Sequence, residues 1–277
     1  MNITGKTKLC IIIGDPVKHS LSPAMHNAAY VALGIDHEFV FVASHVLVED
    51  VKDVIRAMRV MGFRGLTCTV PHKIEVMKYI DKIDPIAQKI GAVNTVVNEN
   101  GILTGYNTDW LGTVIPLEKH GTLKNKKVAL IGAGGAARAC GYGVIEKGAK
   151  LTIYNRTVEK AEELAHECDS KVEVRSLENI SEEMKDHDII LNATTMGMGK
   201  NEGMSPVPKS AIGRHHIVFD SVYSPFETQL LKDAKEQGAT IIHGTEMLLH
   251  QGTEQFRLYT GHTAPENVMR EVLMNTK

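Results

Sequence analysis

Residues 128–138 read VALIGAGGAAR, an apolar run followed by a turn of small residues. The pattern predicts a strand over Val128–Ile131, a tight turn, and a helix over Ala136–Lys147. The spacing Gly132-x-Gly134-x-x-Ala137 is typical of a dinucleotide-binding turn. There the first glycine makes the turn, the second lets a pyrophosphate approach the backbone, and the third small residue lets the helix pack on the strand. Unpaired N–H groups at the helix N-terminus then hold the phosphate charge.

The residues that follow the next strand, Leu151–Tyr154, are those that distinguish NAD-binding from NADP-binding proteins. An NAD enzyme usually has Asp or Glu about 20 residues beyond the glycine turn, where the carboxylate binds the ribose hydroxyls. This chain has Asn155 and Arg156 there, with Lys160 one turn further on. The lack of a carboxylate removes repulsion of a 2′-phosphate, and a guanidinium can bind that phosphate. We therefore expect NADP, the alternative being a solvated basic start of a helix.

Length and composition exclude several classes of protein. The 277 residues suffice for two domains, and 43% apolar with 23% charged residues is typical of a soluble globular protein. A net charge of −2 does not indicate the excess of positive charge that binding to nucleic acid or to a membrane surface requires. The apolar run Leu9–Ile13 is far too short to span a bilayer, so we expect a cytoplasmic protein. Four scattered cysteines predict buried, reduced thiols: Cys10, Cys68, Cys140 and Cys168.

Strands and helices alternate along the chain, which predicts an α/β protein. A first α/β unit runs to about Asp109, and its first helix is expected to have Ser22 as N-cap and Pro23 as first residue. Residues from about Trp110 to Gly244 predict a doubly wound parallel sheet of Rossmann type. Its strands are expected near Val128, Leu151, Val172, Ile189, Ile217 and Thr240, and two further helices are expected over 247–259 and 265–274.

A nicotinamide enzyme that acts on an alcohol or ketone also needs a group that moves the hydroxyl proton. The chain has no Tyr-x-x-x-Lys pair and no Cys and His cluster typical of zinc, so we expect no metal. The adjacent His215 and His216 are expected to point apart on a strand. The proton carrier should then lie at a strand end, where Lys73, Asn94 and Asp109 are candidates. Each could instead be structural: a surface lysine, a turn residue and a helix cap.

Several separated motifs extend this interpretation to the whole chain. They are His19-Ser20-Leu21-Ser22-Pro23 with His26-Asn27, Thr69-Val70-Pro71-His72-Lys73, Gly91-Ala92-Val93-Asn94-Thr95, Asn107-Thr108-Asp109, residues 132–138, Asn155-Arg156-Thr157, Asn192-Ala193-Thr194 with Gly197-Met198, residues 220–225 and residues 244–251. In this order they resemble the shikimate/quinate dehydrogenase family over essentially the full length.

The resemblance implies an NADP-dependent oxidoreductase that reversibly reduces 3-dehydroshikimate to shikimate, a step toward chorismate and the aromatic amino acids. It implies that Lys73 and Asp109 form the catalytic pair, with Lys73 the leading proton carrier. The implied substrate-binding residues are Ser20, Ser22, Thr69, Lys73, Asn94, Asp109, Tyr223 and Gln251. The implied cofactor-binding residues are Gly132, Ala133, Gly134, Gly135, Ala136, Asn155, Arg156, Thr157, Lys160, Val222 and Gly244.

The resemblance also implies how the chain is divided. Because Gln251 would bind substrate, the C-terminal helices should return to the first unit. The expected domains are a substrate-binding catalytic domain, 1–109 plus 245–277, and an NADP-binding Rossmann domain, 110–244. A homodimer is one option for its assembly. The chain departs from the family pattern at Thr67, at Trp110, where glycine is usual, and at Gly252, where alanine is usual.

Two other functions fit parts of the sequence. A quinate/shikimate dehydrogenase that uses NAD would need to accept one more hydroxyl, and Ser22 and Arg156 argue against it. A sensor that binds a dinucleotide without catalysis would have lost Lys73 or Asp109, and both are present.

Overall fold

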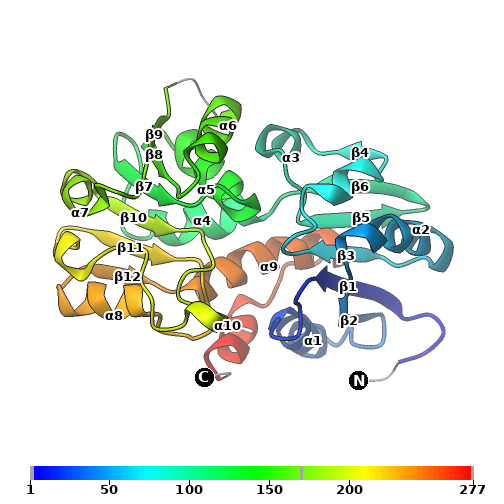
Figure 1. The fold of residues 1–277 in the computed structure, drawn as a ribbon. Helices are drawn as coiled ribbons and strands as arrows, with labels where there is room; N and C mark the ends of the chain where they lie inside the picture. Colours follow the sequence, from blue (N-terminus) through cyan, green and yellow to red (C-terminus); the bar gives the residue numbers. More distant parts are fainter. Residues whose placement is uncertain (1–2, 169–170, 276–277) are drawn as a thin grey trace. The chain divides into compact units, whose positions relative to one another are not determined.

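The computed structural model describes residues 3–168 and 171–275. The chain divides into two compact units. The first comprises the residues up to Thr108 and those from Gln251 on, and the second is Asp109–His250. Each unit contains a six-stranded sheet, and the strands and helices of both are labelled in Figure 1. The second division falls inside helix α9, Gly244–Thr260, whereas the predicted second domain ends at Gly244, the first residue of this helix.

The first unit has a mixed sheet in the order β2-β1-β3-β5-β6-β4. Strands β2, β1 and β3 are parallel neighbours, and β5 runs antiparallel to both β3 and β6. The hairpin of β5 and β6 turns at Asn100 and Gly101, which both have positive φ, a conformation that asparagine and glycine tolerate well. The elements are β1 Lys8–Gly14, α1 Ser22–Ala32, β2 Phe39–His45, a 3-10 turn Val48–Asp50, α2 Val51–Met61, β3 Gly65–Cys68, a 3-10 turn Glu75–Lys78, β4 Lys82–Ile83, α3 Pro85–Ile90, β5 Thr95–Glu99, β6 Ile102–Tyr106 and α10 Glu266–Asn275.

The C-terminal helices join the first unit, as expected. Helix α10 packs against α1, and its Met269 and Leu273 are buried. Gly252 of α9 allows this packing, because a Cβ at that position would lie 2.3 Å from Cε of Met25 and 3.7 Å from Cε of Met269. The glycine that replaces the usual alanine therefore makes room for the tip of a methionine from α1.

One cap in this unit is placed differently from the sequence prediction. The N-cap of α1 is Leu21, so Ser22 is the first helical residue and the prediction of Ser22 as N-cap is wrong. No side chain caps the helix, and the Ser22 N–H donates instead to Oγ of Ser20 at 3.3 Å. This short-range bond satisfies one backbone donor of the first turn.

The second unit has a fully parallel sheet in the order β12-β11-β10-β7-β8-β9. This is the doubly wound order, in which the strand sequence reverses at β7, and it confirms the predicted Rossmann-type sheet. All six predicted strands are present. The elements are α4 Asp109–Glu118, β7 Lys127–Ile131, α5 Gly135–Glu146, β8 Lys150–Tyr154, α6 Val158–Cys168, β9 Glu173–Arg175, α7 Ile180–Glu183, β10 Ile189–Asn192, β11 Ile217–Asp220, α8 Gln229–Glu236, β12 Thr240–Ile242 and the first part of α9, with 3-10 turns at Met184–Asp186, Gly199–Asn201 and Lys209–Ala211.

Helix α4 packs closely on α5, and Trp110 takes part in this contact. The Trp110 ring lies edge-on to Tyr142, with 5.9 Å between ring centroids and 89° between planes. Gly143 permits the approach, since a Cβ there would lie 2.9 Å from Cγ1 of Val114 and 3.2 Å from the Trp110 carbonyl oxygen. Trp110 therefore packs on the neighbouring helix of its own unit.

The adjacent histidines His215 and His216 lie in the turn before β11, with ring centroids 3.9 Å apart. The expectation that they point apart on a strand is therefore wrong. Cys10, Cys68 and Cys140 are buried free thiols, and Cys168 is partly exposed. In the part of the chain that the structure describes, no helix has both the length and the apolar character needed to cross a membrane.

A buried carboxyl group ties together the loops that follow β10 and β11. Asp220 accepts hydrogen bonds from Nδ2 of Asn192 at 2.9 Å, the Val222 N–H at 3.0 Å and Oγ1 of Thr228 at 2.6 Å. The Asn192 side chain in turn accepts from Thr194. Burial raises the pKa of Asp220 to about 6, because desolvation of the carboxylate outweighs these three bonds.

The Asp220→Asn variant should therefore change how stability depends on pH. In the wild type, the raised pKa contributes stability that is complete below about pH 4 and is lost as pH rises through 6. Asparagine cannot ionise, so the advantage of the wild type over the variant should shrink by about 2 kcal/mol between pH 4.5 and 7.5. Urea unfolding at both pH values measures this difference. Asp53→Asn, at an exposed position, is the control, and a difference independent of pH for Asp220→Asn would contradict the prediction.

Candidate active site

Gly132 ends β7 in a conformation that requires glycine. Its φ is +115°, and a Cβ would lie 2.9 Å from Cγ2 of Thr194 and 3.1 Å from the Ala193 carbonyl oxygen. Its N–H donates to the Tyr154 carbonyl at 2.8 Å, which fixes the end of β7 against β8. The chain therefore turns sharply at the centre of the sheet, as the sequence spacing predicts.

The turn leads into α5 with an uncapped N-terminus. Gly134 is the N-cap residue, no side chain caps the helix, and its first turn has no acidic residue. A Cβ on Gly134 would meet no atom within 4 Å, so the space beside this backbone is open. Ala137 is fully buried where α5 packs on the sheet. Exposed N–H groups at a helix start next to open space fit a pyrophosphate.

The end of β8 presents positive charge. The side chain of Asn155 donates from Nδ2 to the Thr157 carbonyl at 2.7 Å, which closes the turn before α6. Arg156 and Lys160 are exposed, and neither makes a hydrogen bond or ion pair with any residue that the structure describes. Two cations without protein partners beside a turn that lacks a carboxylate fit a 2′-phosphate.

Val222 and Gly244 lie against each other at the carboxyl end of β11. A Cβ on Gly244 would lie 2.4 Å from the Val222 carbonyl oxygen and 2.7 Å from that of Ser221. Only a glycine lets α9 begin this close to the loop after β11. Tyr223 follows in the same loop, where burial raises the pKa of its hydroxyl.

In the first unit, Asn94 is the centre of a buried polar cluster. Its Oδ1 accepts from the Thr108 N–H at 2.9 Å and from Oγ1 of Thr95 at 2.7 Å. Its Nδ2 donates to Oγ1 of Thr108 at 2.9 Å and to Oε1 of Gln251 at 3.5 Å. The structure thus brings Asn94 and Gln251 together, although they are 157 residues apart in sequence.

Backbone hydrogen bonds hold Thr69 and Lys73 next to this cluster. The Val93 N–H donates to the Lys73 carbonyl at 2.8 Å, and the Cys68 N–H donates to the Asn94 carbonyl at 2.8 Å. The Thr69 N–H donates to the Ile13 carbonyl at the end of β1. The loops after β1, β3 and α3 therefore meet at one end of the first sheet, where ligands of such sheets bind.

Ser20 and Ser22 lie in the loop that links β1 to α1. Ser22 is buried and Ser20 is partly exposed. The same loop is tied to the one that carries Thr69, because the Asp15 N–H donates to the Val70 carbonyl at 3.0 Å. Two hydroxyl groups at the start of a helix suit a carboxylate.

The predicted residues are divided between the two units. Ser20, Ser22, Thr69, Lys73, Asn94 and Gln251 belong to the first, and Asp109, Tyr223 and all the predicted cofactor-binding residues belong to the second. The pairing of Lys73 with Asp109 stays a prediction. Thr108 bonds Asn94 through both its N–H and its hydroxyl, a role that the sequence analysis does not give it. Its position in a polar run directly after an apolar strand was the available signal.

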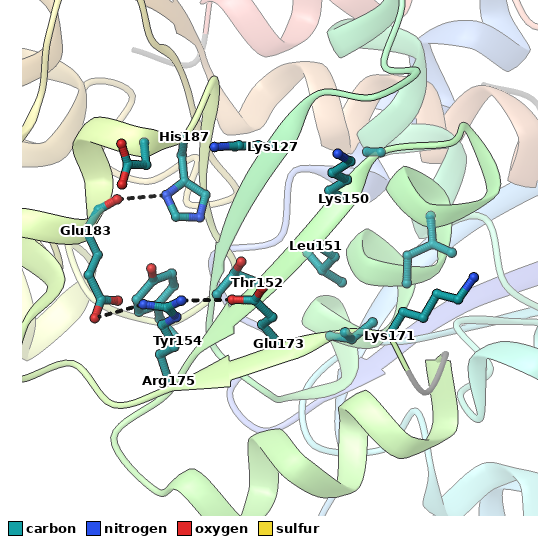
Figure 2. A pocket seen from close by; sticks show the side chains of 14 residues that line it. Lys127, Lys150, Leu151, Thr152, Tyr154, Lys171, Glu173, Arg175, Glu183 and His187 are labelled. Carbon is teal, nitrogen blue, oxygen red and sulfur yellow. Dashed lines mark hydrogen bonds and ion pairs between the residues drawn. The ribbon is translucent and has the colours of Figure 1, made fainter.

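A separate hollow of about 480 Å³ lies beside β8 and β9 in the second unit (Figure 2). Arg175 in its wall is paired with Glu173 at 2.9 Å and with Glu183 at 3.2 Å. None of the residues predicted to bind the dinucleotide lines it. Among the described residues, no group of three or more His, Cys, Asp or Glu side chains is arranged to hold a metal ion.

Comparison with known proteins assigns both units of the chain to one family. Residues 12–96 match the model of the shikimate dehydrogenase substrate binding domain. Residues 115–203 match the model named shikimate / quinate 5-dehydrogenase. Residues 244–274 match the shikimate 5′-dehydrogenase C-terminal domain. The three matches follow one another along the chain and cover strands and helices of both units.

Individual proteins give the same result. The shikimate dehydrogenase (NADP(+)) of Methanosphaera stadtmanae is 41% identical over 94% of this chain and 94% of its own. A crystal structure of a shikimate dehydrogenase in complex with NADP+ is 41% identical, with a TM-score of 0.93 over 99% of this chain and 97% of that one. The Listeria monocytogenes shikimate 5-dehydrogenase in complex with shikimate and NAD is 37% identical, with a TM-score of 0.89 over 99% and 98% of the two chains. This chain therefore belongs to the shikimate/quinate dehydrogenase family.

Proposed function

We propose that this protein catalyses the reversible, NADPH-dependent reduction of 3-dehydroshikimate to shikimate, on the route to chorismate and the aromatic amino acids. The observation that carries the proposal is the uncapped N-terminus of α5 with Arg156 and Lys160 nearby in sequence, in a member of this family. That arrangement is suited to a dinucleotide with a 2′-phosphate.

NADP would be held by the second unit. The backbone of Gly132, Ala133, Gly134, Gly135 and Ala136 would bind the pyrophosphate, with the α5 N–H groups as donors. Asn155, Arg156, Thr157 and Lys160 would surround the 2′-phosphate, and Val222 and Gly244 would flank the nicotinamide. When bound, NADPH supplies the hydride of the reaction.

The substrate would be bound by the polar loops of the first unit. Ser20 and Ser22, aided by Tyr223, would hold the carboxylate. Thr69, Asn94 and Gln251 would bind the ring hydroxyls. Hydrogen bonds join the loop after β1 to the loop after β3, the end of β3 to the Asn94 carbonyl, and the Asn94 side chain to Gln251. They support this assignment, because they hold donors from separate parts of the chain near one another.

Lys73 and Asp109 would move the proton. Lys73 Nζ gives a proton to the carbonyl oxygen as the carbon is reduced, and takes it back when shikimate is oxidised. Asp109 orients the lysine and balances its charge. The chain itself supports the pairing: Lys73 is bonded to Val93, the neighbouring Asn94 is bonded to Thr108, and Asp109 is the next residue.

The NAD-dependent quinate reaction is the nearest alternative. The cations at the end of β8 favour NADP, since Arg156 and Lys160 have no protein partner among the described residues. A cytoplasmic location, the lack of nucleic-acid partners and a homodimer stay predictions of the sequence.

The Lys73→Met variant should lose turnover because the proton carrier is gone, while NADP affinity stays unchanged. We expect kcat to fall by about 10²- to 10⁴-fold. Lys78→Met is the matched control, since Lys78 is an exposed lysine of the same segment that pairs with Glu75. Steady-state kinetics with shikimate and NADP test this, and a Lys73→Met enzyme with wild-type kcat would refute the assignment.

Arg156→Gln should reduce discrimination between the two cofactors. Loss of a charge-assisted bond to the 2′-phosphate should raise KM for NADP by about 10- to 100-fold and leave KM for NAD unchanged. Arg214→Gln, which removes an exposed arginine from a turn of the same unit, controls for net charge. Equal effects on the two cofactors would count against the assigned role of Arg156.

Gly134→Ser should separate folding from cofactor binding. A Cβ at Gly134 has open space, and a serine at this N-cap position can accept from the N–H groups of α5. Thermal unfolding without ligand should therefore be unchanged or slightly higher, whereas the upward shift on adding NADP should shrink. Gly5→Ser, also in open space, should behave as the wild type. An undiminished NADP shift in Gly134→Ser would show that phosphate does not bind there.

A further inference from the structure

Gln255 is a buried polar residue that the proposed site does not use. It lies on α9 one turn after Gln251 and is fully buried. Its Nε2 donates to Oγ1 of Thr95 at 2.9 Å, across 160 residues of sequence. Thr95, at the start of β5, is also fully buried and donates to Oδ1 of Asn94 at 2.7 Å. A continuous line of hydrogen bonds therefore leads from α9 to the centre of the substrate half-site.

One backbone group fixes the direction of this line. The Thr108 N–H can only donate, and it points at Oδ1 of Asn94 at 2.9 Å. The atom of Asn94 at this position must be the oxygen, so the Thr95 hydroxyl must give its proton to it. Oγ1 of Thr95 can then only accept from Gln255. The Gln255 amide is thereby held with its amino group toward Thr95.

The other end of the Gln255 amide, Oε1, is buried without a hydrogen-bond partner among the described residues. Burial lowers the pKa of His26 to about 3, and the Gln255 side chain opposes that shift. Both ring nitrogens of His26 are buried without a hydrogen-bond partner among the described residues. His26 is held by stacking on Phe41, with ring centroids 4.4 Å apart. The orientation of the Gln255 amide therefore rests on its bond to the Thr95 hydroxyl.

The line also sets the orientation of Gln251. With its oxygen occupied, Asn94 presents Nδ2 to Oε1 of Gln251 at 3.5 Å. The oxygen of Gln251 thus faces Asn94, and its amino group faces the other way. A glutamine in this orientation donates to a ligand, which suits the oxygen of a substrate hydroxyl or carbonyl.

We propose that Gln255 and Thr95 are positioning residues that fix the amide orientation of Asn94 and, through it, the amino group that Gln251 offers to the substrate. The substrate class so recognised is a ring that bears oxygen acceptors. The proposal rests on the proposed function for the identity of the substrate, and on the hydrogen bonds of the first unit for the positioning.

The first test examines the side-chain amide of Asn94 in protein without ligand. Its ¹⁵N–¹H₂ signals can be assigned by their loss in Asn94→Asp. In the wild type these hydrogens should exchange slowly with solvent, because Asn94 is 1% exposed and bonded on both sides. Thr95→Val, which keeps the shape but removes the hydroxyl, and Gln255→Leu should shift the signals and speed exchange. Thr95→Ser, which keeps the hydroxyl, should restore the wild-type signals.

The second test is kinetic. Thr95→Val and Gln255→Leu should each raise KM for shikimate by about five- to tenfold and leave KM for NADP unchanged. The double variant should be no worse than the poorer single variant, because both changes interrupt the same line. Thr95→Ser should recover most of the loss. Thr260→Val, which removes a hydroxyl that bonds the Phe256 carbonyl on the same helix, should have no effect on either KM.

The two tests separate the two proposals. If the wild type does not turn over shikimate, the proposed function fails, yet the Asn94 amide signals still decide the positioning role. Unchanged amide signals in Thr95→Val, or equal losses in Thr95→Val and Thr95→Ser, would overturn the positioning role whatever the substrate.

Discussion

The positive φ of Gly132 is the constraint on which the nucleotide unit depends. It bends the chain at the strand where the sheet order reverses, and the Thr194 side chain leaves no room for a Cβ. Because the turn is this tight, α5 starts at the carboxyl edge of β7 and its N–H groups lie there without a side-chain cap. Open space beside Gly134 completes the arrangement. The placement of α5 and the position of its first N–H groups thus depend on one residue.

The loops that carry the proposed substrate-binding residues of the first unit are held together in a different way. They come from separate parts of the sequence, and backbone N–H donors join them: Val93 to Lys73, Cys68 to Asn94 and Thr108 to Asn94. A donor that belongs to the backbone cannot rotate away. The first two bonds join backbone to backbone and fix the course of the loops, and the Thr108 N–H fixes the side chain of Asn94. Amide side chains have two similar ends, and only such fixed partners give them one orientation.

Local patterns account for what the sequence could predict. Six strands of the second sheet and the turn at Gly132 follow from apolar runs that end in glycine or polar residues. The N-cap of α1 was misplaced by one residue because the Ser22 N–H bonds Ser20 across a short turn. The short β4 gave no signal. Partners such as Gln255 and Thr95 lie 160 residues apart, and one sequence contains no pattern that pairs them.

The residues proposed to bind cofactor and those proposed to bind substrate differ in burial, and their sensitivity to conditions should differ accordingly. Arg156 and Lys160 are exposed, so their attraction for a phosphate is screened by salt. The hydrogen bonds of Asn94 lie in the protein interior, where dissolved ions do not screen them. A buried polar group that loses its partner there is destabilised by the full free energy of its desolvation. On the proposed assignment, single surface substitutions can change cofactor choice, whereas substrate recognition depends on the packing of β5 and α9. A change of substrate would require several buried residues to change together.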